Sequence, residues 1–137
     1  MRVHPIFTQP KDWSGDGAID GIEALVELSD QFGDPTKARG QVIFELYTFR
    51  RANPDPRGDR LQTWVMPIHT LAQQKEHWRR IGGAYAFQLP FPGISSTGEI
   101  TIMEGDKKRH QGLVLSAEVT LDDGGRMRDH INLGSPK

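Results

Sequence analysis

The chain has 137 residues, no cysteine, and a formal net charge of −1 from 17 basic and 18 acidic residues. A chain of this length buries a core in one domain without disulfides, and the missing cysteines exclude thiolate metal sites and a cysteine nucleophile. The balanced charge gives no electrostatic footprint for nucleic acid, and no apolar run approaches the ~20 residues that span a bilayer. We therefore expect one globular domain with no nucleic-acid partner and no transmembrane segment.

The first segment, residues 1–21, contains Pro5, Pro10 and several glycines without a sustained period, which predicts an extended arm. Apolar residues then alternate over residues 22–28. This pattern is typical of a half-buried strand, although Glu, Ala and Leu also favour a helix there. Residues 42–49 predict a second strand that is apolar on both faces, so we expect it in the centre of a sheet.

A third strand is predicted over residues 61–66, and one short helix follows at about 71–81. Thr70 and Gln73 have the spacing of a capping box, in which each side chain satisfies a free main-chain donor of the first turn. Gly82 supplies the signal that ends the helix.

Three more strands are predicted at residues 85–89, 100–102 and 113–121, where apolar residues alternate again. From residue 122 the sequence is polar and rich in glycine, which predicts a fraying tail. Strands separated by turn signals, with one helix, indicate a mainly β protein, an antiparallel β-sandwich of about six to seven strands. The predicted organisation is an arm at 1–21, a β-sandwich domain at 22–121 and a polar tail at 122–137.

Residues 12–23 match the 12-residue calcium loop of EF-hand proteins. Calcium takes six to eight oxygen ligands, and such a loop supplies them from positions 1, 3, 5, 7, 9 and 12, with glycine turning the chain at position 6. Gly17 occupies that turning position. The predicted calcium ligands are Asp12, Ser14, Asp16, the Ala18 carbonyl, Asp20 and Glu23. Serine at the third position offers a neutral oxygen, which lowers the expected affinity.

The surroundings of this loop differ from those of an EF-hand. Pro5 and Pro10 oppose a helix before the loop, and the segment after it has the pattern of a strand. The alternative interpretation is a surface turn in which Asp and Gly serve only the backbone conformation. Both interpretations stay open at the level of sequence.

The Asp-rich loop resembles the calcium loops of thrombospondin type 3 repeats and dockerins. The whole chain resembles uncharacterised bacterial cell-envelope β-sandwich modules at Asp16 to Glu23, at Glu45-Leu46-Tyr47 and at Trp78. The second resemblance implies export and surface or lipid-anchored attachment, and it implies no known activity. No apolar segment follows Met1, so no signal peptide is seen and a cytoplasmic location stays open.

These observations predict a non-enzymatic cell-envelope or secreted β-sandwich module that calcium stabilises. An alternative is a recognition module that binds a polysaccharide or a protein surface through Trp13 and the loop at residues 50–60. A small hydrolase is the third possibility. The chain contains neither a Gly-x-Ser-x-Gly motif nor the histidine spacing of a zinc site, so no catalytic residue is predicted.

Overall fold

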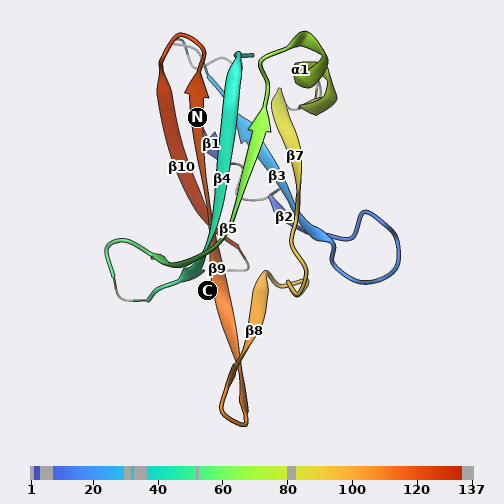
Figure 1. The fold of residues 1–137 in the computed structure, drawn as a ribbon, viewed down its shortest axis with the longest axis vertical. Coiled ribbons are helices and arrows are strands. Elements are labelled where there is room, and N and C mark those ends of the chain that lie inside the picture. The colour runs from blue at the N-terminus through green and yellow to red at the C-terminus, as the bar shows by residue number, and fades with distance from the viewer. Residues whose placement is uncertain are drawn as a thin grey trace.

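The computed structural model describes residues 2–3, 8–29, 32, 37–51, 53–79 and 83–133. Two antiparallel sheets pack face to face, and one short helix lies at one end of them (Figure 1). The predicted fold class, a mainly β protein with antiparallel sandwich architecture and one short helix, is confirmed. The helix of the described residues has 7 residues, far fewer than the ~20 that a helical membrane span needs.

The first sheet has the strand order β1–β3–β7–β6, and β2 also pairs with β3. Its strands are β1 (Arg2–Val3), β2 (Gln9–Lys11), β3 (Gly21–Glu27), β6 (Trp78–Arg79) and β7 (Ala84–Pro90). The alternation at residues 22–28 therefore belongs to a strand and not to a helix. β1 and β2 share one edge of β3, because β1 lies opposite residues 26–27 whereas β2 lies opposite residues 21–23.

Thr8 fills the gap that β1 and β2 leave along β3. Its Oγ1 accepts a hydrogen bond from the Leu25 amide at 3.0 Å and donates one to the Leu25 carbonyl at 3.4 Å. Thr8 is only 4% exposed. One side chain thus replaces the main-chain partner that a continuous neighbouring strand would supply.

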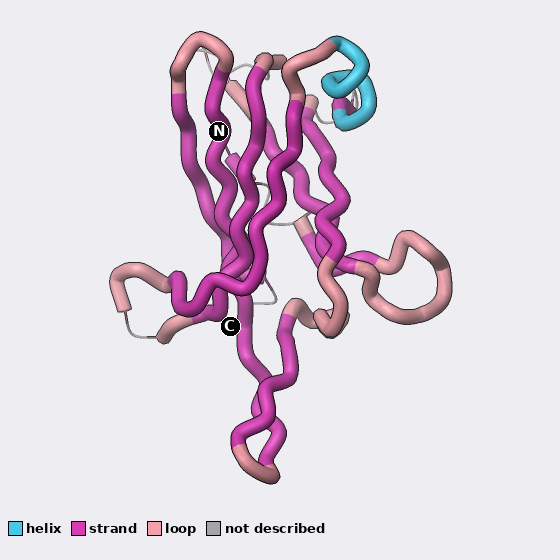
Figure 2. Tube along the Cα trace, viewed as in Figure 1, coloured by secondary structure: helices cyan, strands magenta, loops and turns pink. Residues whose placement is uncertain are grey.

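The second sheet has the order β10–β9–β4–β5, and β8 pairs with β9. Its strands are β4 (Gly40–Phe49), β5 (Arg57–Pro67), β8 (Glu99–Glu104), β9 (Lys107–Leu121) and β10 (Arg126–Leu133). β4 lies between β9 and β5, as its two apolar faces predicted. β8 and the first part of β9 form a ribbon that extends beyond the sandwich to a turn at Gly105 and Asp106 (Figure 2).

The core lies between the two sheets and follows the period-2 alternation of the sequence. Its strand residues include Ile22, Ala24, Val26, Val42, Phe44, Leu46, Tyr85, Phe87, Leu89, Leu113, Leu115, Ala117 and Val119. Phe44 and Phe87 meet edge to face across the sheets, with ring centroids 5.2 Å apart. Burial of each large apolar side chain stabilises the fold by ~1.5–3 kcal/mol, so the alternation determines which faces turn inward.

Residues 126–133, which the sequence predicted as part of a polar tail, form β10 and pair with β9 over their whole length. Leu133 lies in the core, and Met127 and Ile131 pack against it. Every second residue from Met127 to Leu133 is at least partly buried, and one of these is the polar Asp129. This residue interrupts the apolar alternation, which is why the strand is hard to see in the sequence. The described sandwich thus extends past residue 121, and β1 and β2 extend it into the predicted arm.

The helix α1 (Leu71–His77) begins with the predicted capping box. It ends before the predicted residue 81, because Trp78 is extended, with φ −69° and ψ 131°, and starts β6. The Trp78 ring packs edge to face on Tyr85, with centroids 5.1 Å apart. Gly82, the predicted stop signal, lies outside the described residues.

Candidate metal centre

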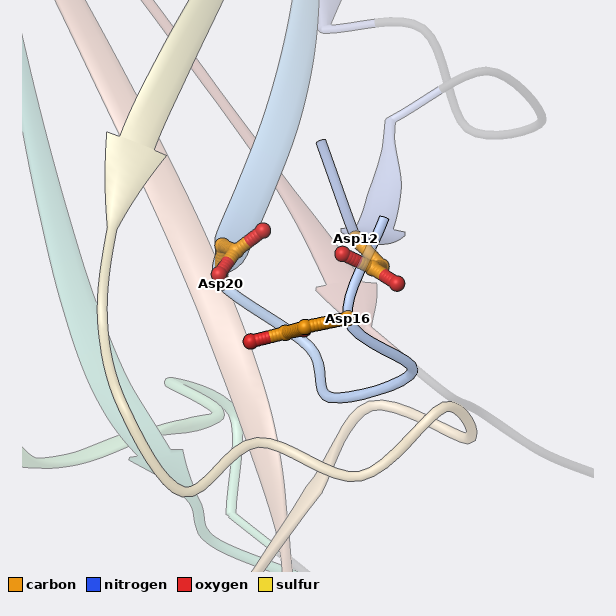
Figure 3. Close-up of side chains that lie close together, drawn as sticks. All are labelled: Asp12, Asp16 and Asp20. Atoms are coloured by element: carbon orange, nitrogen blue, oxygen red, sulfur yellow. The ribbon is translucent and has the colours of Figure 1, made fainter. Parts of the chain in front are cut away.

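The predicted calcium loop connects β2 to β3 and projects from the side of the sandwich (Figure 1). Lys11 and Gly21 lie opposite each other at the ends of the two strands. The Asp20 amide donates to the Lys11 carbonyl at 3.0 Å and closes the base of the loop. The strand pairing therefore brings the first and ninth positions of the pattern, Asp12 and Asp20, to the same end of the sheet (Figure 3).

Asp12 organises the turn of the loop. Its Oδ1 accepts a hydrogen bond from the Gly15 amide and its Oδ2 accepts one from the Gly17 amide, both at 2.8 Å. The two glycines have φ of 79° and 88°, a left-handed conformation that costs glycine little and other residues more. These hydrogen bonds, chiefly that from Gly17, lower the pKa of Asp12, so the side chain is an anion at neutral pH.

Asp20 holds the other side of the loop. Its Oδ2 accepts hydrogen bonds from the amides of Trp13 at 2.9 Å and Ser14 at 2.8 Å. Its carbonyl accepts a hydrogen bond from the Phe91 amide at 3.1 Å, just after β7. Asp20 thus connects the loop to the first sheet through both its side chain and its main chain.

Asp16 completes a group of three carboxylates (Figure 3). One oxygen from each of Asp12, Asp16 and Asp20 lies within 4.8 Å of the other two. Calcium holds its oxygen ligands at ~2.3–2.6 Å, so two ligands of one ion lie at most about 5 Å apart. A carboxylate has about four lone-pair sites, so an oxygen that accepts an amide hydrogen bond still has room for a cation. The three oxygens therefore fit one hard divalent cation.

Two of the remaining predicted ligands belong to the same loop. Ser14 Oγ lies 3.2 Å from Asp12 Oδ1 and 3.2 Å from Asp20 Oδ1, so the hydroxyl bridges these two carboxylates. The Ala18 amide donates to Asp16 Oδ1 at 2.9 Å, which fixes the main chain at the seventh position.

Glu23, the predicted ligand at position 12, does not join the three aspartates. It is part of β3, where it lies opposite Gln9, and its Oε1 accepts a hydrogen bond from Lys11 Nζ at 3.3 Å. An EF-hand loop turns into a helix at its end, whereas this loop continues into a strand. Because β3 is extended, the Glu23 side chain stands on the sheet surface next to the side chains of the neighbouring strand β2.

Trp13, a predicted contact residue of the alternative recognition module, lies against the first sheet. A Cβ atom at Gly21 would lie 2.8 Å from Trp13 Cη2, so the indole covers Gly21. Trp64 is part of the core, and Trp78 packs against it. The described parts of the loop between β2 and β3 and of the loop between β4 and β5 project from opposite sides of the sandwich (Figure 1).

Two histidine contacts join residues that are far apart in the sequence. His69 Nδ1 lies 2.7 Å from Asp122 Oδ1 at an exposed position. His77 Nδ1 lies 3.0 Å from the Ala86 carbonyl oxygen, beside a cleft that is lined by α1, β5 and β7. No local pattern marks either contact, because each depends on how distant segments pack.

No protein-family model matches the chain, and comparisons with curated proteins and with solved structures find no match.

Proposed function

We propose that the protein is a non-enzymatic β-sandwich module whose loop at residues 12–20 binds calcium and is stabilised by it. The observation that carries the proposal is the group of three carboxylates, Asp12, Asp16 and Asp20, with one oxygen of each within 4.8 Å of the others. Their spacing in the sequence is that of positions 1, 5 and 9 of a calcium loop. Position 6, where such loops need glycine, is Gly17 with φ 88°.

The protein ligands in this proposal are the three carboxylates, the Ser14 hydroxyl and the Ala18 carbonyl. These groups supply fewer oxygens than the six to eight that calcium takes, so water completes the shell. Glu23 is not included because it pairs with Lys11. A loop without the strong acidic ligand at position 12 suits the weak affinities of extracellular modules, with Kd of about 10⁻⁴–10⁻³ M. We propose with it a cell-envelope or secreted location, because extracellular modules bind calcium with affinities of this order.

Calcium would act on the stability of the folded protein and not on a reaction. The loop is joined to the first sheet by the contacts of Asp20 with Lys11 and Phe91. Unfolding separates the three carboxylates, so an ion that needs all three binds only the folded chain. At ten times its Kd, a ligand of this kind stabilises the folded state by about 1.4 kcal/mol.

The experiment is a thermal unfolding measurement on metal-stripped protein with EDTA, with calcium and with magnesium. We expect calcium above its Kd to raise Tm by about 5 °C, from that free energy and the entropy of unfolding of a domain this size. Asp16→Asn is the informative variant, because Asp16 accepts only one hydrogen bond within the loop, from Ala18. Asp106→Asn is the matched control, because it removes one negative charge at the tip of the β8–β9 ribbon.

The wild type and the Asp106→Asn control should gain Tm with calcium, whereas Asp16→Asn should not. Equal melting temperatures of the wild type in EDTA and in millimolar calcium would contradict the proposal. An equal calcium response of the wild type and Asp16→Asn would place any bound calcium elsewhere.

A further inference from the structure

A cleft of about 290 Å³ lies where β4 ends, β5 begins and the β8–β9 ribbon leaves the sandwich, at the end of the molecule opposite α1 (Figure 1). Phe49 of β4 and Ile102 of β8, which are both partly buried, form its apolar wall. Its charged lining residues are Arg50, Asp59 and Arg109. Ligand pockets begin at about 300 Å³, so the cleft has room for one small molecule.

One side of the cleft is built on an irregularity in the pairing of β4 with β5. From Tyr47 to Phe49 β4 advances two residues, whereas the opposite segment of β5 advances three. The extra residue is a β-bulge, and such bulges often re-aim side chains at functional sites. The Asp59 amide donates to Thr48 Oγ1 at 2.9 Å, so a side chain replaces a ladder partner there. A Cβ atom on Gly58 would lie 2.9 Å from the Thr48 carbonyl oxygen, so a larger residue would push the strands apart.

The base of the ribbon is fixed against the end of β4. Gln111 Nε2 donates a hydrogen bond of 2.7 Å to the Phe49 carbonyl. Gly112 lies next to the same residue, since a Cβ atom on it would be 3.5 Å from Phe49 Cβ. These contacts hold the first part of β9 beside β4. Arg50 and Arg109, which are far apart in the sequence, therefore line one cleft.

Neither arginine of the cleft is fully neutralised within the described part of the chain. Arg50 donates to the main-chain carbonyl of Asp55 at 3.3 Å, whereas the Asp55 carboxylate pairs with Arg57 at 2.9 Å. Arg109 pairs with Glu104 at 3.0 Å, but both side chains are more than half exposed, and such a pair contributes little. A guanidinium has five N–H donors, so each arginine has donors left for a ligand carboxylate.

We infer that this cleft binds an acidic sugar, that is, a hydroxylated ring with one carboxylate. The two arginines bind the carboxylate, because the planar guanidinium matches its geometry. The Asp59 carboxylate only accepts hydrogen bonds, so it disfavours a simple anion and suits a ring hydroxyl next to the carboxylate. The Thr48 hydroxyl can donate to a second ring oxygen, since its own oxygen accepts from the Asp59 amide. Phe49 and Ile102 offer an apolar wall to the C–H groups of the ring.

The test is an NMR titration of metal-stripped, ¹⁵N-labelled protein with sodium glucuronate, at constant pH and ionic strength. We expect glucuronate at millimolar concentration to shift the amides of Thr48, Arg50, Asp59 and Gln111. Glucose lacks the carboxylate and acetate lacks the hydroxylated ring. Each should bind about tenfold more weakly than glucuronate, which is the factor for one lost hydrogen bond to a charged group.

Arg50→Gln removes one guanidinium from the cleft and should weaken glucuronate binding about tenfold. Arg51→Gln is the matched control, because it removes the same charge at an exposed neighbouring position outside the cleft, and it should bind like the wild type. The inference is overturned if glucuronate shifts none of these amides at millimolar concentration, or if glucose or acetate binds equally well. It is also overturned if Arg50→Gln and Arg51→Gln bind equally well, since attraction to the net charge alone would give that result.

Discussion

Replacement of Thr8 by valine tests the claim that this side chain stands in for a strand residue between β1 and β2. Valine has the branched shape of threonine but no hydroxyl, so the substitution removes both hydrogen bonds to Leu25, at 3.0 and 3.4 Å, and keeps the branch at Cβ. The Leu25 amide then loses its partner on an edge that Thr8, at 4% exposure, keeps largely dry. Thr8→Ser is the control, because it keeps the hydroxyl and loses only the methyl group.

The expected loss follows from the two hydrogen bonds. An unsatisfied buried donor or acceptor costs about 1–3 kcal/mol. Leu25 is half-buried, so we expect Thr8→Val to lower the free energy of unfolding by about 1–2 kcal/mol. The control loses one methyl group, worth about 0.8 kcal/mol or less. Urea unfolding monitored by tryptophan fluorescence measures both values.

Amide hydrogen exchange gives a local readout of the same contact. Exchange of the Leu25 amide should accelerate in Thr8→Val more than the global loss of stability accounts for, and it should stay slow in Thr8→Ser. Suppose that Thr8→Val is no less stable than Thr8→Ser and that the m value, the slope of the unfolding free energy against urea concentration, is unchanged. The Thr8 hydroxyl then does not support β3, which contradicts its role as a substitute for a strand residue.

Trp64→Phe should lower the free energy of unfolding, measured in urea, by about 2 kcal/mol, because it removes the Nε1 hydrogen bond to Pro90 and leaves a cavity beside β7. The Trp78 side chain is half-exposed, so Trp78→Phe should lower it less. The Arg57 guanidinium, through its hydrogen bonds, lowers the pKa of Asp55 from 3.8 to about 2. Any stability that this carboxylate contributes is fully present above pH 3.8 and is lost as the pH falls through about 2. An NMR pH titration should show this low pKa, and Arg57→Gln should return the pKa toward 3.8. Gly17→Ala should weaken calcium binding in calorimetry, since alanine resists the φ of 88° that turns the loop.

The strands that the sequence predicted best are those that supply the core. In β4 the residues Val42, Phe44 and Leu46 alternate without interruption and all are buried. Burial against the facing sheet dominates their energetics, so the local pattern is sufficient. β10 was missed because Asp129 breaks its inward series, and only its pairing with β9 makes it a strand.

In the candidate site, too, local sequence was sufficient only where the residues lie close together in the chain. Asp12, Asp16 and Asp20 lie within one loop, so their spacing in the sequence nearly determines their spacing in space. Glu23 lies beyond the loop, where the direction of its side chain depends on β3. The ion pair with Lys11 follows from the register of β2 and β3, which the loop pattern does not contain.

The most direct test of the central claim is isothermal titration calorimetry of calcium with metal-stripped protein, comparing the wild type, Asp16→Asn and Glu23→Gln. We expect the wild type to bind one calcium ion with a Kd of about 10⁻⁴–10⁻³ M. Asp16→Asn should lose this binding, whereas Glu23→Gln should retain it within about twofold, because Glu23 pairs with Lys11 outside the carboxylate group. No binding heat at millimolar calcium, or equal binding by the wild type and Asp16→Asn, would contradict the central claim.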